Sequence, residues 1–239
     1  MPMITRSGNI VGKHTFEKHH CSREEQRIHY RLANQYHLSY VPRIHDLHVV
    51  NVQSGTIVME KIIGKTLLEW WASQTRTSVR AKRKMFGVLQ TIVKYLIQLH
   101  KLGILHNDIK GENIMIERKT EHVKIIDFGH SAYIDRTQKN LIQSQAHHDP
   151  PEMKKGMGIG GTAIDVFCFT RMLLEELNIG EFTNDAGRTQ TWICALFDDQ
   201  ERKNLTNILW APVRSRSSFN PILHVLDAAE RRLGICGNK

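Results

Sequence analysis

Short apolar runs in the first sixty residues give way to longer helical patterns in the rest of the chain. Four brief runs rich in β-branched residues favour β-strands. They are residues 10–11, 41–44, 47–50 and 56–59. From residue 67 onward the apolar positions recur every three or four residues, which is the period of an α-helix. Strands followed by helices are typical of an α+β fold with two lobes.

A capped helix is predicted within the strand-rich part. Ser22 can accept a hydrogen bond from the helix N-terminus, and Glu25 three residues later completes a capping box. Apolar residues follow on one face, so the helix should run to about Gln35.

The second part of the chain combines three helices with one hairpin. Residues 67–71 begin a short helix, and residues 81–102 have the pattern of a long amphipathic one. Two strand-like pieces follow, at 113–116 and 123–126. Residues 163–178 are apolar on nearly every side, which predicts a helix buried all round.

The composition narrows the class of protein. The 239 residues are 41% hydrophobic, which can fill a packed core and argues against disorder. No apolar run approaches the ~20 residues that cross a bilayer. The four cysteines are scattered and form no CxxC pair, so they should be reduced thiols. With no apolar leader segment, we expect a soluble intracellular protein, cytoplasmic or nuclear, without a membrane partner.

The net charge is +9, from 33 basic and 24 acidic residues. Such a balance favours acidic partners, including nucleotides and acidic protein surfaces. The basic residues are spread along the chain and are not interleaved with aromatic ones, so nucleic-acid binding is not expected.

One segment concentrates residues that can do chemistry. Residues 106–113 read His-Asn-Asp-Ile-Lys-Gly-Glu-Asn, and Asp-Phe-Gly follows at 127–129. The first half resembles the catalytic loop of protein kinases, and the second resembles their DFG motif. The interval of nineteen residues between Asp108 and Asp127 holds the predicted hairpin. Two carboxylates and an amide brought together in this way suit phosphoryl transfer, which depends on positioning and charge neutralisation.

The likeness continues downstream. Pro-Pro-Glu at 150–152 stands where kinases carry Ala-Pro-Glu, and Asp165 matches the aspartate that braces the catalytic loop. Arg216, with Arg214 as the alternative, resembles the late arginine that pairs with the Glu of that motif. The chain therefore resembles the protein kinase superfamily over roughly residues 57–225.

The resemblance implies a role for each matching residue. Asp108 would be the catalytic base, and Lys110 would lie near the transferred phosphate, as in Ser/Thr kinases. Asn113 and Asp127 would hold Mg²⁺, with Asp127 bridging the metal to the phosphates of ATP.

The resemblance also divides the chain into a reduced N-terminal lobe, 1–60, and a helical C-terminal lobe, 61–239, of one kinase domain. Met59, Glu60 and Lys61 would form the hinge against which the adenine of ATP hydrogen-bonds.

The upper lobe departs most from the family pattern. Lys13 is the first candidate for the phosphate-binding lysine and Glu25 for its helix partner, with Lys18 and Glu24 as the alternatives. No GxGxxG precedes residue 59, so we expect the phosphate-covering hairpin to be shortened or missing. ATP should then bind weakly unless a regulatory protein partner completes the lobe.

Another departure is Asn107, which stands where kinases have an arginine and argues against activation by loop phosphorylation. The leading hypothesis is a Mg²⁺- and ATP-dependent Ser/Thr protein kinase with a protein substrate. The alternatives are a catalytically weak or inactive kinase-like binding module and a small-molecule kinase of the aminoglycoside or choline type.

Overall fold

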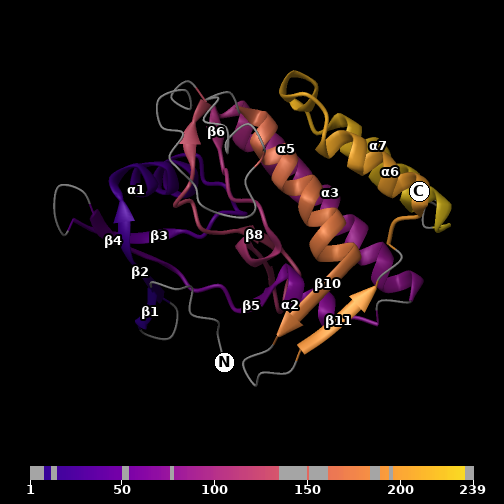
Figure 1. Cartoon of the computed structure of the whole chain (residues 1–239). Helices are drawn as coiled ribbons and strands as arrows, with labels where there is room; N and C mark the ends of the chain where they lie inside the picture. Colours follow the sequence, from indigo (N-terminus) through magenta and orange to yellow (C-terminus); the bar gives the residue numbers. More distant parts are fainter. Residues whose placement is uncertain are drawn as a thin grey trace.

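The computed structural model describes residues 8–11, 15–49, 54–75, 78–134, 150, 161–183, 189–193 and 196–234. An antiparallel sheet and one helix form one side of the molecule, and long helices form the other (Figure 1). Within these ranges no helix is both long and apolar enough to span a bilayer.

The N-terminal sheet, which we call the upper sheet, has the strand order β1-β2-β4-β3, and we call the helical rest of the chain the lower part. The strands of the upper sheet are β1 (Gly8–Val11), β2 (Thr15–Ser22), β3 (Ile44–Val49) and β4 (Ser54–Glu60). The predicted strands at 10–11 and 56–59 are confirmed within β1 and β4. The strand predicted at 47–50 is confirmed over residues 47–49 within β3, and residue 50 lies outside the described residues. The one predicted at 41–44 is wrong, because β3 begins only at Ile44. Pro42 has no N–H for a strand ladder, and the Asn34 side chain bonds both the N–H (3.2 Å) and the C=O (2.9 Å) of Ile44 where β3 begins.

Helix α1 (Arg23–Tyr30) continues as one wider turn, η1 (Arg31–Gln35), so the predicted helix over 22–35 is confirmed. Ser22 Oγ accepts the predicted hydrogen bond from the Glu25 N–H at 3.0 Å. The Glu25 carboxylate turns instead toward Lys18, so only half of the predicted capping box forms.

The lower part is built on α3 (Val79–Lys101), whose apolar face is buried, and on α5 (Thr162–Arg171) with its wider continuation η4 (Met172–Asn178). The predicted all-round burial of this second element is confirmed from 163 to 173 with few exceptions. The other described helices are α2 (Leu67–Ala72), α6 (Asp199–Leu209) and α7 (Asn220–Arg232), with the short turns η2 (Gly111–Asn113) and η5 (Val213–Arg216). Helices α6 and α7 lie side by side (Figure 1).

The predicted hairpin is confirmed as β7 (Ile114–Glu117) and β8 (Val123–Ile125), joined by β5 (Gly64–Thr66) in the order β5-β7-β8. Two small antiparallel pairs complete the described strands. They are β6 (Ile104–Leu105) with β9 (Ala132–Tyr133), and β10 (Ile179–Thr183) with β11 (Thr189–Ile193).

Helix α1 shares its core with the lower part rather than with the upper sheet. Ile28 and Leu32 are fully buried in the same apolar cluster as Leu89 and Phe128. The upper sheet has a separate small cluster of Cys21, Ile44, Ile57 and Met59. The position of α1 is therefore coupled to the packing beneath it.

Candidate active site

The catalytic loop is held by one buried carboxylate. Asp165, near the start of α5, has no exposed surface. Its Oδ2 accepts the His106 N–H at 3.0 Å, and its Oδ1 accepts the Asn107 N–H at 2.7 Å. The His100 Nε2 lies 2.8 Å from the same Oδ2. The predicted bracing of the loop by Asp165 is confirmed.

This brace is electrostatically favourable. Burial alone would raise the pKa of Asp165, but the hydrogen bond from His100 and the neighbouring His106 hold that pKa below its ordinary value. At Asn107 the backbone is left-handed, with φ at 63°. Asn tolerates that region better than most residues, and its side-chain Nδ2 donates to the His130 C=O at 3.0 Å.

Three predicted residues meet around one carboxylate. Lys110 Nζ and Asn113 Nδ2 each lie 2.8 Å from Asp108 Oδ2. Asn113 Nδ2 also lies 2.8 Å from the Asp108 C=O, which closes the loop on itself. Burial would lower the pKa of Lys110, but the hydrogen bond to Asp108 and the negative charges of Asp108, Glu112 and Asp127 together outweigh it and raise that pKa.

The β7–β8 hairpin carries Asp127 to the same place. The Ile126 N–H donates to the Asn113 C=O at 2.9 Å, so the backbones of the two predicted metal-binding positions run side by side. Asp127 itself is left-handed, with φ at 63°, and its Oδ1 accepts the Gly129 N–H at 3.2 Å.

Lys18 joins this group to the upper lobe. Its ammonium lies 2.5 Å from Glu25 Oε1 and 2.7 Å from Asp127 Oδ1. Burial would lower the pKa of Lys18, but the charges of Asp127 and Glu25 outweigh it and raise that pKa. Burial would raise the pKa of Asp127, but Lys18 holds it below its ordinary value. The two groups therefore stay charged as a pair.

The lysine that the structure places beside Glu25 is Lys18, the alternative. Lys13, the first candidate, lies outside the described residues. Lys18 lies on β2 (Thr15–Ser22), a strand that the hydrophobic pattern did not predict. The pairing of β2 with β4 shifts between Lys18 and Cys21, and His20 there has a φ of 57°. The helix partner is Glu25 as predicted, since no hydrogen bond is found for the buried Oε1 of Glu24 among the described residues.

The predicted hinge spans the end of β4, whose last two residues are Met59 and Glu60. Met59 is buried in the small upper cluster, and Lys61 lies in the connection to β5. The Glu60 N–H donates to the Arg43 C=O at 2.8 Å, and its carboxylate lies 3.2 Å from Lys124 Nζ. The Glu60 amide is therefore engaged within the protein, and an adenine contact at these three residues stays a prediction.

Sequence reasoning did not single out the packing beneath Asp127. Phe128 lies between two imidazoles, with ring centroids 5.2 Å from His29 and 5.2 Å from His106. Burial lowers the pKa of His29 to about 4, and its Nε2 lies 2.8 Å from the Pro42 C=O. The position of His29, one helical turn after Glu25, was the available signal.

Glu176 was also missed. Its Oε2 accepts the Gly111 N–H at 2.8 Å, a second tie on the catalytic loop. A Cβ at position 111 would meet Leu68 Cγ at 2.6 Å and Glu176 Oε2 at 2.9 Å, so the close approach requires glycine. Burial raises the pKa of Glu176 to about 7.

Of the predicted pair between the late arginine and Glu152, the structure describes only the arginine. Arg216 is buried over the ring of Phe167, at 5.1 Å, whereas Arg214 is exposed. This burial favours Arg216 for the structural role. Glu152, its predicted partner, lies outside the described residues.

The residues present fit a magnesium-bound triphosphate. Mg²⁺ prefers oxygen donors and is commonly held by one or two protein groups together with substrate phosphates. Asp127 offers a carboxylate, and Asn113 directs its Nδ2 at Asp108, which leaves its amide oxygen as the remaining donor atom. Lys18 supplies positive charge beside them.

Comparisons with known proteins agree with this geometry. A dual specificity tyrosine-phosphorylation-regulated kinase 2 of Drosophila melanogaster is 42% identical over 86 residues, 36% of this chain and 12% of that protein. Mitogen-activated protein kinase kinase 9 of Arabidopsis thaliana is 34% identical over 142 residues, 55% of this chain and 45% of that protein. The chain thus spans less than half the length of these relatives.

A solved structure has the same fold. The structure of the kinase PK-1 of the Cydia pomonella Granulovirus matches with a TM-score of 0.59 and 16% identity, over 87% of this chain and 83% of that one. The protein kinase domain family matches residues 6–218. Together with the braced loop and the Lys18–Glu25–Asp127 group, this match shows that the chain belongs to the protein kinase family.

Proposed function

We propose that the chain is a Mg²⁺- and ATP-dependent protein kinase that phosphorylates serine or threonine hydroxyls of a protein substrate. The observation that carries the proposal is the convergence on Asp127, which contacts Lys18 from the upper sheet and adjoins the loop of Asp108 and Asn113. A non-catalytic module has no physical need for all of these groups in one place.

The chemistry follows from what each residue can do. Asp108 is placed to accept the proton of the attacking hydroxyl, and general-base catalysis contributes about 10²- to 10⁴-fold. Lys110, whose ammonium is 2.8 Å from Asp108, would offset the negative charge of the transferred group. Its presence at this position resembles Ser/Thr kinases and supports that specificity.

The upper group would orient the nucleotide. When bound, Mg²⁺ neutralises phosphate charge, and Asn113 and Asp127 are the residues that would hold it. Lys18, kept protonated and fixed by Glu25, would contact the phosphates. Met59, Glu60 and Lys61 are proposed to border the adenine.

The test is transfer of radiolabel from γ-labelled ATP by the purified chain. Peptides carrying Ser, Thr or Tyr are offered in parallel with an aminoglycoside and choline. We expect transfer to Ser or Thr peptides, lowered at least about 10²-fold by Asp108→Asn and abolished by Asp127→Asn. The control, Asp199→Asn, removes an equally charged group that is 93% exposed and should leave transfer unchanged.

Unaltered transfer in Asp127→Asn would refute the metal assignment. Transfer only to choline or the aminoglycoside would refute the protein substrate.

A further inference from the structure

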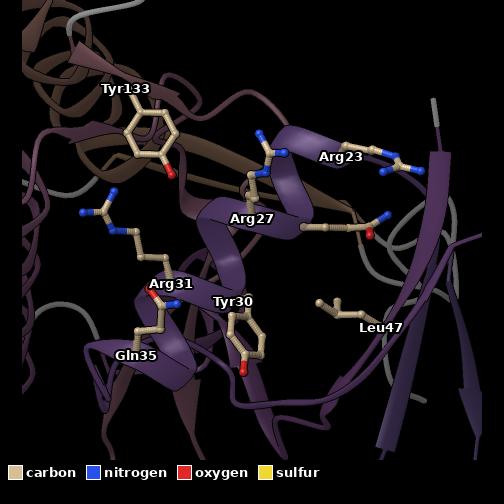
Figure 2. Close-up of a pocket in the computed structure, with 8 residues that line it drawn as sticks. Arg23, Arg27, Tyr30, Arg31, Gln35, Leu47 and Tyr133 are labelled. Carbon is tan, nitrogen blue, oxygen red and sulfur yellow. The ribbon is translucent and has the colours of Figure 1, made fainter. Parts of the chain in front are cut away.

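The outward face of α1 carries a row of arginines that the proposed catalytic site does not use. Arg23, Arg27 and Arg31 follow one another at intervals of four residues, so they lie on successive turns of one face. Figure 2 shows the three side chains projecting from the helix, with Leu47 on the neighbouring strand.

These arginines border a pocket of about 280 Å³. Tyr30 and Leu47 add apolar surface, and Tyr133 from β9 closes the end next to Arg31 (Figure 2). Tyr30 is 41% exposed, so part of its ring faces solvent at the edge of the pocket. Every residue that lines the pocket in the described part of the chain is basic, neutral polar or apolar.

The positive charge of this row is not balanced within the described structure. Arg171, Arg202 and Arg232 each pair with a carboxylate. Arg23 and Arg27 are exposed, and no ion pair joins either of them to a described residue. Arg31 is held by neutral groups, since its Nη2 lies 2.7 Å from the Tyr36 hydroxyl and its guanidinium lies 5.7 Å from the Tyr133 ring centroid.

We propose that this face of α1, which we call the arginine face, binds an acidic segment of a protein partner. The three guanidinium groups would take carboxylates or phosphate groups of the segment, because arginine binds both with paired N–H donors. Tyr30 and Leu47 would take an apolar side chain between them. An exposed aromatic residue beside arginines is the composition of protein-binding surfaces.

The position of the arginine face on α1 means that a bound segment could affect the Lys18–Glu25 pair. The opposite side of α1 carries Glu25, whose carboxylate fixes Lys18 at 2.5 Å. Arg27 lies only two residues after Glu25, so a segment docked on the arginine face bears on the helix that positions the proposed phosphate-binding lysine. This regulatory consequence rests on the proposed function, whereas the binding itself does not.

Binding is tested on the full chain with a fluorescein-labelled peptide of twelve residues, nine glutamates and three leucines. Fluorescence anisotropy in 50 mM salt measures the binding. A matched peptide carries glutamine in place of every glutamate. We expect the glutamate peptide to bind and the glutamine peptide to bind at least about tenfold more weakly, because the contacts are ionic.

Charge reversal locates the site. Arg27→Glu should weaken binding at least about tenfold, and Arg27→Lys should retain most of it. The matched control is Arg80→Glu, which reverses an exposed charge at the start of α3 and should change binding less than about twofold. Thermal unfolding of each variant shows that it is folded.

Equal weakening by Arg27→Glu and Arg80→Glu would overturn the proposal, because attraction would then depend on net charge alone. Absence of peptide binding would overturn it too. Tighter binding of a single-stranded oligonucleotide, lost in Arg27→Glu, would overturn the choice of a protein partner. Loss of all phosphate transfer with intact peptide binding would count against the proposed function and not against this site.

Discussion

The lower and upper halves of the candidate active site are held in different ways. Below, the catalytic loop is tied through its own backbone: Asp165 accepts two N–H groups and Glu176 accepts a third. Above, a single side chain, that of Lys18, bridges Glu25 and Asp127. Backbone ties to buried carboxylates persist as long as the helices pack. A side-chain bridge persists only while α1 stays in place, so the upper half is the adjustable one.

The largest effect should come from the lower brace. The Asp165 carboxylate accepts three hydrogen bonds in a buried place. In Asp165→Asn, the NH₂ group of the new amide would point at N–H groups that have lost their acceptor. We expect the free energy of unfolding to fall by about 3 kcal/mol, measured by urea denaturation. A loss below about 1 kcal/mol would mean that the loop is held mainly by packing.

The upper bridge should matter for activity more than for stability. Lys18→Met removes the cation between two carboxylates, and we expect phosphate transfer to fall about 10²-fold, or about 2.7 kcal/mol. The free energy of unfolding should fall less, by about 2 kcal/mol, because the Glu25 carboxylate is only 5% exposed and loses its charge partner. A large loss of stability with normal transfer would reverse the comparison.

Glu176 should make the second tie on the loop sensitive to pH. Its pKa in the folded protein is about 7, above the ordinary 4.5, so the folded state holds the proton more tightly. The contribution of Glu176 to stability is therefore greatest at low pH and is lost as pH rises through about 7.

We expect Glu176→Gln, relative to the parent, to gain about 2 kcal/mol between pH 5 and pH 8, after allowance for solvent screening. Urea denaturation at both pH values measures it. A difference that does not change with pH would show that Glu176 is ionised throughout.

The smallest effects come from two helix caps. Ser22 caps α1 in the upper half and Thr66 caps α2 in the lower half, and loss of either to Ala should cost about 1 kcal/mol. Only Ser22→Ala should lower phosphate transfer per folded molecule, by a few-fold, because α1 carries Glu25. Equal transfer rates in the two variants would contradict the dependence of the bridge on α1.

The same contrast explains what the sequence could predict. Asp108, Lys110, Asn113 and Asp127 lie within twenty residues on one loop and one hairpin, so their spacing defines their geometry. The lysine of the bridge lies on β2 (Thr15–Ser22), a strand whose mostly polar sequence carries no alternating hydrophobic pattern. The strand predicted at 10–11 made Lys13 the first candidate, whereas the lysine found beside Glu25 is Lys18, five positions later.

Hydrogen bonds between residues far apart in the sequence could be predicted only where one of the residues belongs to a known family motif. Asp165 was found because a family pattern marks it, although it lies 58 residues from Asn107. Glu176 contacts Gly111 across 65 residues and belongs to no pattern that sequence reasoning used. Its polar side chain, in a helix expected to be buried on all sides, was the only trace of that contact.

The buried thiol of Cys21 offers a way to detect opening of the upper lobe. It is 1% exposed, it points at the Lys18 C=O 3.2 Å away, and burial raises its pKa to about 12. A thiol in that state resists alkylation, since the thiolate is the reactive form. We expect the sulfur to become accessible to water and to alkylating reagents only when the end of β2 opens and Lys18 leaves Glu25. The rate at which a maleimide labels Cys21 would therefore measure how often the bridge opens, in the absence of any substrate.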